Sequence, residues 1–232
     1  MKSVQAKITI LINNVTQNPA MIAEHGLSLF IESDGKKILF DCGQDGFVLE
    51  NNARVLGINI QEIETLILSH GHYDHTGGVP RLLLAGRKVD VYAHSGVLTT
   101  RYSMSSGSPK SNGISAPACA ALKDWPSDSL HWTGQPLLIT ERIGVTGPVP
   151  RESSYEDTGG AFFLDDAGCR PDPLCDDQSI WIDTDQGLVV CAGCSHSGII
   201  NTLKYIQKLN PGKKLRAVIG GFHMVNAGPE RI

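Results

Sequence analysis

The chain has 232 residues, a length that fits one ordinary domain or one large α/β domain with insertions. Its 20 basic and 24 acidic residues leave a formal net charge of −4, which provides no basic surface for nucleic acid or anionic lipid. Hydrophobic residues are 41% and charged residues 19% of the chain, a balance that supports a buried core and excludes intrinsic disorder. The longest apolar runs are far shorter than the ~20 residues of a membrane span, and the first residues contain no signal-peptide pattern. We therefore expect a cytoplasmic protein.

Short segments rich in aliphatic and β-branched side chains, separated by turn signals, predict strands along most of the chain. They lie at residues 9–12, 27–32, 37–40, 64–68, 89–93, 136–140, 160–164, 179–183, 188–192 and 215–219. Apolar residues at helical spacing predict helices at 47–56 and 198–209. Between them, residues 95–130 are dominated by Ser, Gly, Pro and Ala without periodicity, which is typical of a lid, a binding loop or an insertion. This order of elements predicts a layered α/β or α+β fold.

Four candidate metal ligands follow the predicted strand at 64–68. They are His70, His72, Asp74 and His75. A buried strand that ends in a loop is a rigid platform from which side chains can surround an ion without distorting the core. Imidazole and carboxylate groups suit Zn²⁺. The density of these residues therefore predicts a zinc site rather than an accidental group of surface side chains.

The motif His70-x-His72-x-Asp74-His75 resembles the signature of the metallo-β-lactamase superfamily. Further segments extend the resemblance over nearly the whole chain, to a branch of 7,8-dihydropterin-6-methyl-4-(β-D-ribofuranosyl)aminobenzene-5′-phosphate synthase-like proteins. They are Glu24-His25-Gly26-Leu27, Leu39-Phe40-Asp41, Pro171-Asp172-Pro173, Asp176-Asp177-Gln178, Gly193-Cys194-Ser195-His196 and Gly220-Gly221-Phe222-His223. The resemblance implies one domain over residues 1–232, folded as an αββα sandwich with a metal site at one edge of its sheets.

The resemblance also implies that two later histidines join the four residues of the motif around one or two zinc ions. The candidates are His196 and His223, each of which follows a predicted strand and at least one glycine. Glycine next to a ligand lets the backbone approach a metal closely. The implied ligand sets are His70, His72 and His196 for one ion, and Asp74, His75 and His223 for the other.

One departure from the family pattern concerns the residue after the late strand. Many members have an aspartate there that bridges two ions, whereas this chain has Cys194. The thiol could ligate zinc or could be buried and inert, which leaves the number of ions open. We expect Asp41 to orient a ligand histidine, and His94 and His25 are further candidates to line the site. Arg151 could bind a substrate phosphate or form a surface ion pair.

These residues predict a zinc-dependent hydrolase, in which activated water attacks an ester, amide or phosphoryl substrate and Asp74 accepts a proton. The alternative, which the resemblance implies, is a transferase that condenses a dihydropterin pyrophosphate with an arylamine ribotide phosphate. A redox protein with a di-iron site on this fold is disfavoured, because His72 stands where iron-binding relatives have a carboxylate.

The expected partner is a small-molecule substrate, phosphorylated in the transferase alternative, and unpaired strand edges are compatible with a homodimer. Similar proteins continue beyond the position of Ile232 through a helix, a strand and a segment that bears Cys and His. We therefore expect the chain to lack the last elements of its family's fold.

Overall fold

The computed structural model describes residues 5–83, 88–104, 107–224 and 227–231. Its strands are β1 (Ala6–Ile12), β2 (Ser28–Ser33), β3 (Lys36–Phe40), β4 (Thr65–Ile67), β5 (Asp90–Ala93), β6 (Tyr102–Ser103), β7 (Lys110–Ser111), β8 (Leu130–Trp132), β9 (Leu137–Leu138), β10 (Ile143–Val145), β11 (Phe162–Phe163), β12 (Ser179–Thr184), β13 (Gly187–Ala192) and β14 (Leu215–Gly220). Its helices are α1 (Gly46–Val55), α2 (Tyr73–Thr76), α3 (Val79–Leu83), α4 (Ala116–Lys123) and α5 (Ile199–Leu209), with 3₁₀ turns at Ile60–Glu62 and Ser95–Leu98.

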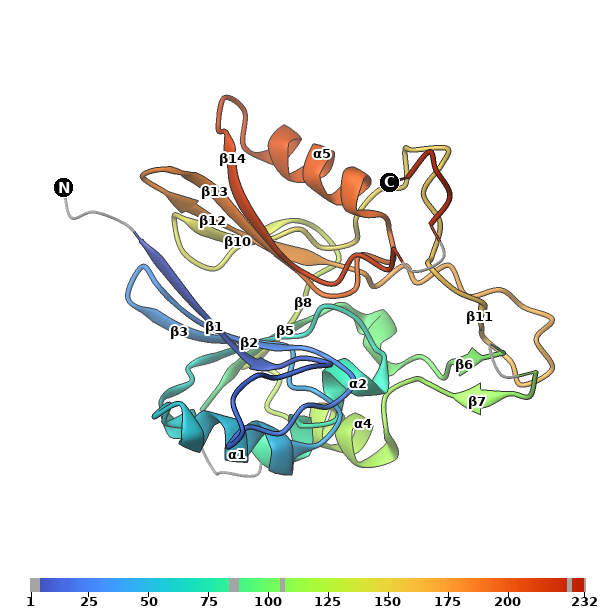
Figure 1. The fold of residues 1–232 in the computed structure, drawn as a ribbon, viewed down its shortest axis with the longest axis horizontal. Coiled ribbons are helices and arrows are strands. Elements are labelled where there is room, and N and C mark those ends of the chain that lie inside the picture. Colours follow the sequence, from blue (N-terminus) through green and yellow to red (C-terminus); the bar gives the residue numbers. More distant parts are fainter. Residues whose placement is uncertain (1–4, 84–87, 105–106, 225–226, 232) are drawn as a thin grey trace.

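Two sheets face each other, and helices cover their outer faces (Figure 1). The first sheet has the order β1-β2-β3-β4-β5-β8, and the second has the order β14-β13-β12-β10-β9. Helices α1 and α4 lie outside the first sheet and α5 outside the second (Figure 1). A third, small sheet of β11, β6 and β7 extends away from the sandwich (Figure 1), and we call it the arm. The four layers are the αββα arrangement expected from the sequence.

Apolar side chains on both faces of the strands explain the layering. In β2, Leu29 and Ile31 are buried between the two sheets, whereas Phe30 packs toward the helices. In β12, Ile180 and Ile182 face the first sheet and Trp181 packs in the α5 layer. A strand with apolar side chains on both faces must be covered on both faces, because successive side chains point in opposite directions.

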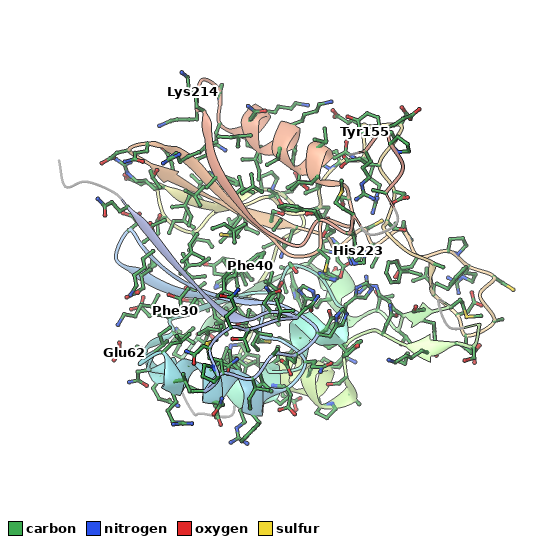
Figure 2. The ribbon with its side chains drawn as sticks, viewed as in Figure 1. Phe30, Phe40, Glu62, Tyr155, Lys214 and His223 are labelled. Atoms are coloured by element: carbon green, nitrogen blue, oxygen red, sulfur yellow. The ribbon has the colours of Figure 1, made fainter. Side chains whose placement is uncertain are left out.

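Parallel strands bring several chain segments to one edge of the sandwich. In the first sheet β3, β4 and β5 run parallel, and in the second sheet β13 and β14 do. The loops that follow β3, β4, β13 and β14 contain Asp41, the 70–75 motif, Cys194 with His196, and His223. These loops meet where the two sheets face each other, and Figure 2 shows His223 at this place.

The segment at 95–130 differs from the expectation of an irregular lid. Helix α4 packs against the first sheet through its buried Ala118 and Leu122. The rest of the segment supplies β6 and β7 of the arm, while residues 105–106 lie outside the described part. Strands β8 and β10, each of three residues, were also not expected. Within the described residues, no helix is long and apolar enough to span a membrane.

Candidate metal centre

Three buried histidines converge at the edge of the sandwich. His70 and His72 belong to the loop after β4, and His196 lies in the loop between β13 and α5. His70 Nε2 is 2.9 Å from His72 Nδ1, which is 3.1 Å from His196 Nε2. Burial lowers the pKa of all three rings well below the usual value, so the imidazoles are neutral near pH 7. Ligand atoms around a tetrahedral Zn²⁺ lie ~3.3 Å apart, so these nitrogens fit one ion.

A second group of donors lies beside the first. His75 Nε2 is 3.1 Å from Cys194 Sγ and 3.5 Å from Asp74 Oδ2. The ring of His223 is centred 4.5 Å from that of His196, so it borders both groups. His70, Cys194 and His196 each offer a donor atom within 4.8 Å of the others. The cysteine sulfur therefore lies between the two groups of donors.

The pKa shifts of His75 and Cys194 are coupled. Burial acts to lower the pKa of His75, but the neighbouring Cys194, Asp41 and Asp74 outweigh it and raise this pKa well above the usual value. Burial raises the pKa of the Cys194 thiol, and His75 opposes that shift. The carboxyl groups of Asp41 and Asp74 both contact the imidazole of His75, an environment that suits a cation.

Asp41 fixes the orientation of His75 and of the loop that bears the motif. Its Oδ2 is 2.6 Å from His75 Nδ1 and accepts a 2.6 Å hydrogen bond from Ser69 Oγ, while Oδ1 accepts one from Ser69 N at 2.7 Å. Ser69 Oγ also lies 2.9 Å from His70 Nδ1. Ring nitrogens bonded in this way leave Nε2 of His70 and His75 facing inward as donors. The role expected for Asp41 therefore has a geometric basis.

Two adjacent carbonyl groups hold the late histidines. His196 Nδ1 lies 2.7 Å from Thr158 O, and His223 Nδ1 lies 3.3 Å from Gly159 O. A carbonyl oxygen can only accept a hydrogen bond, so each Nδ1 carries the hydrogen and each Nε2 keeps its lone pair. The loop at 158–159 thus orients both rings at once.

Asn112, in the loop after β7, orients the ring of His72. Its side-chain amide lies 3.3 Å from His72 Nε2, and its Oδ1 is buried without a partner among the described residues. Amide oxygen and nitrogen are assigned from the hydrogen-bond network, and exchanging them makes Oδ1 the acceptor for His72 Nε2–H. With that proton on Nε2, His72 presents Nδ1 to the other histidines.

Two adjacent aspartates attach both ligand loops to the second sheet. Asp176 Oδ2 accepts a 2.8 Å hydrogen bond from Gly71 N, between His70 and His72, and Asp177 Oδ2 accepts one of 2.7 Å from Ser197 N. Arg101 donates to Asp176 Oδ1 at 2.7 Å and opposes the rise that burial causes in its pKa. Burial raises the pKa of Asp177 to about 6.

Gly193 permits the close approach of the two sheets beside Cys194. A Cβ at this position would clash with the Ser69 side chain. Backbone strain is concentrated in the same place, since Asp41, Ser195 and His223 all have positive φ, at 58°, 54° and 46°. Positive φ is unusual for residues other than glycine and persists where the surroundings over-determine the conformation.

The other candidates differ in their positions. His25 is two-thirds exposed, and its Nε2 lies 3.4 Å from Asp74 Oδ2 at the mouth of the site. The structure does not bring His94 into the cluster, because its Nδ1 accepts a hydrogen bond from Gly96 N and caps the 3₁₀ turn after β5. Arg151 donates to Pro173 O and does not line either of the pockets described next.

Two pockets meet at the cluster. One, of about 340 Å³, lies between the loops after β1, β13 and β14. The other, of about 800 Å³, lies between the cluster and the arm. The residues that line both are His25, Asp74, Cys194 and His223. The candidate donors therefore form a wall that is reached from two sides.

The Lactamase_B family model, described as the metallo-β-lactamase superfamily, matches residues 22–163. The chain belongs to the metallo-β-lactamase superfamily. It is 30% identical to the 7,8-dihydropterin-6-methyl-4-(β-D-ribofuranosyl)-aminobenzene-5′-phosphate synthase of Methanocaldococcus jannaschii, over 93% of this chain and 76% of the relative. It is 33% identical to an uncharacterized protein of the same organism, over 94% of this chain and 79% of the relative.

Solved structures agree with this family. A metal-dependent hydrolase of the β-lactamase superfamily superposes with a TM-score of 0.77 at 28% identity, covering 98% of this chain and 80% of the other. A metallo-β-lactamase-like protein of Thermotoga maritima, with a TM-score of 0.52 at 15% identity, shares the fold over 93% and 97% of the two chains. The chain is therefore an enzyme of a superfamily whose members typically bind metal ions.

We expect Asp41→Asn to weaken metal binding about ten- to a hundredfold. Asparagine tolerates the positive φ of this position, but its amide cannot replace both carboxylate contacts to Ser69 and His75. Competition against a chromogenic chelator measures the affinity. The matched control is Asp34→Asn, which makes the same change at an exposed turn with φ of 50°. Equal affinity in the two variants would show that Asp41 does not orient a metal ligand.

Proposed function

We propose that the centre holds one cation between His70, His72 and His196, and a second between Asp74, His75 and His223, with Cys194 as a thiolate ligand. The observation that carries this proposal is the convergence of three neutral imidazole nitrogens at 2.9 and 3.1 Å. Imidazole, thiolate and carboxylate together suit Zn²⁺. A cation would also lower the pKa of the Cys194 thiol, which burial alone raises.

Cobalt substitution tests the place of Cys194 in this set. We expect zinc-depleted protein loaded with Co²⁺ to show the near-ultraviolet charge-transfer band of a thiolate ligand, and Cys194→Ser to lose it. The control is Cys169→Ser, which removes an exposed cysteine and leaves the band unchanged. A band of full intensity in Cys194→Ser would remove this cysteine from the ligand set.

As the activity of this centre, we propose hydrolysis of an ester, amide or phosphoryl bond in a small molecule. When bound, the cation supplies Lewis-acid chemistry, because it acidifies water and polarises a carbonyl or phosphoryl oxygen. Asp74 faces both pockets, and its Oδ2 lies 3.4 Å from His25 Nε2. The Asp74 carboxylate accepts the proton of the attacking water and passes it through the exposed His25 to solvent.

We expect His72→Ala to lose metal and to lower kcat/KM for chromogenic phosphodiesters and carboxylic esters at least about a thousandfold. The reason is that Lewis-acid stabilisation is worth several kcal/mol of the barrier. Elemental analysis gives the metal content, and urea unfolding checks that the variant is folded. The matched control is His131→Ala, since His131 pairs with Asp90 at the outer strand β8. Turnover retained in metal-free His72→Ala would refute the proposal.

The two pockets favour a second candidate, condensation of two organic molecules across the metal centre. A hydrolase needs room for one organic substrate and water, whereas the shared wall of Asp74, Cys194 and His223 separates two pockets of about 340 and 800 Å³. A similar protein is named as a synthase that forms a dihydropterin-arylamine phosphate compound. On this proposal the pterin and the arylamine would enter from opposite sides of the wall.

Incubation with a dihydropterin pyrophosphate and an arylamine ribotide phosphate tests the second candidate. We expect a condensation product and inorganic pyrophosphate, both identified by mass spectrometry, and neither with His72→Ala. Release of pyrophosphate without a condensation product would favour hydrolysis. No reaction at all, from protein that hydrolyses chromogenic esters, would exclude this condensation.

A further inference from the structure

A row of three side chains crosses the arm at one register. Ser103 of β6 is directly opposite both Lys110 of β7 and Phe162 of β11. Residues directly opposite each other in a sheet point to the same face. All three line the pocket of about 800 Å³, so this face of the arm is a wall of that pocket. We call these residues the arm row.

The inner end of the row contacts the metal centre. The ring of Phe162 is centred 4.9 Å from that of His72 and 5.2 Å from that of His196. Gly160 leaves room for this ring, because a Cβ there would lie 2.9 Å from two of its carbons. Phe162 therefore offers an apolar ring edge or face next to the place where the reacting bond would lie.

The outer end of the row carries a positive charge. Lys110 is exposed and has no ion pair with any residue in the described ranges. Besides Lys110, the ionisable side chains that line this pocket in the described structure are those of three histidines, Tyr73, Asp74 and Cys194. Two strand spacings separate the backbones of Lys110 and Phe162, which amounts to roughly 10 Å. The row thus carries its cation, Lys110, two strands away from Phe162, the residue that contacts the histidines.

We propose that the arm row is a subsite for an oxyanion group, a phosphate or a carboxylate, at the end of an elongated substrate that lies away from the reacting bond. An apolar or aromatic portion packs on Phe162, Ser103 lies beside the middle of the molecule, and the Lys110 ammonium binds the anion. This inference deepens the proposed function and rests on it, since it names the class of substrate that the larger pocket takes. A lysine suits this place because it is a flexible point charge that reaches anions of different shape.

Binding of a matched pair of probes tests the subsite directly. Suberanilic acid has an aromatic anilide at one end and a carboxylate at the other, and its methyl ester is neutral but otherwise alike. We expect calorimetry on the metal-loaded protein to show about fivefold tighter binding of the acid, the size expected for one exposed charge pair. The preference should shrink at high ionic strength, because salt screens exposed charges.

Variants at position 110 show whether Lys110 causes the preference for the acid over the ester. Lys110→Ala should abolish it, Lys110→Glu should invert it, and Lys110→Arg should retain it. Lys123→Ala is the matched control, because Lys123 is an exposed lysine on α4 outside the pocket. A preference for the acid that survives in Lys110→Glu would show that its carboxylate binds the metal centre instead, and would overturn the proposal. Equal binding of acid and ester by the unaltered protein would overturn it too.

The outcome is independent of turnover. Calorimetry reports binding without catalysis, so an absence of hydrolysis would refute the proposed function while the effect of Lys110 on binding still decides the subsite. Conversely, normal hydrolysis of neutral esters together with unchanged probe binding in the Lys110 variants would refute the subsite alone.

Discussion

The site depends on where the protons of its histidines lie. Burial keeps His70, His72 and His196 neutral, and a neutral imidazole has one N–H and one lone pair. The outward-facing nitrogen of each ring hydrogen-bonds to a surrounding loop. The inward-facing nitrogens, with their lone pairs, therefore lie 2.9 and 3.1 Å apart. Lone pairs held this close repel unless they share a cation. In the proposed centre, the fold therefore determines which nitrogen of each ring faces the cation.

The two sheets meet in a way that makes this choice rigid. The segment that leads from β11 of the arm into β12 of the second sheet binds backbone groups of the loops that bear the candidate ligands, through Asp176, Asp177 and Gln178. Gln178 Nε2 donates to Leu68 O at 2.7 Å, immediately before the motif. Because Asp41 holds the same loop from β3, the motif is tied to both layers of the sandwich. Loss of one tie should therefore loosen a ligand without unfolding the core.

The sequence was most informative where chemistry and periodicity are local. Short runs of aliphatic and β-branched residues predict the central strands such as β2 and β12, and the dense motif after β4 identifies the loop that the structure places beside His196. Of the groups that orient the rings, Asp41 was expected from the sequence, whereas the side chain of Asn112 and the carbonyl of Thr158 were not. Asn112 and the Thr158 carbonyl reach the site through loops far along the chain, and nothing in their neighbours reveals this.

The arm and α4 illustrate two different reasons for a missed element. Strands β6 and β7 of the arm were not predicted, and they are two residues long, too short for a sequence pattern to show. Strand β11 lies within the strand predicted at 160–164, but its pairing with the distant β6 is not readable from the sequence. Helix α4 did leave a signal, because Ser115 caps it and a proline stands in its first turn. The composition of the region, rich in Ser, Gly and Pro, concealed that signal.

The arm is a sheet separate from the sandwich, so substitutions in it can change substrate preference during evolution. Its three strands form a sheet of their own in the described structure, and the isolated bridge between His72 and Gly113 lies beside its base. Lys110, at the outer end of its pocket face, is exposed and belongs to neither sheet of the sandwich, whereas Phe162 at the inner end packs on His72 and His196. New substrate preferences can therefore arise by exchanges at the outer end of the arm, while the centre beside Phe162 stays unchanged.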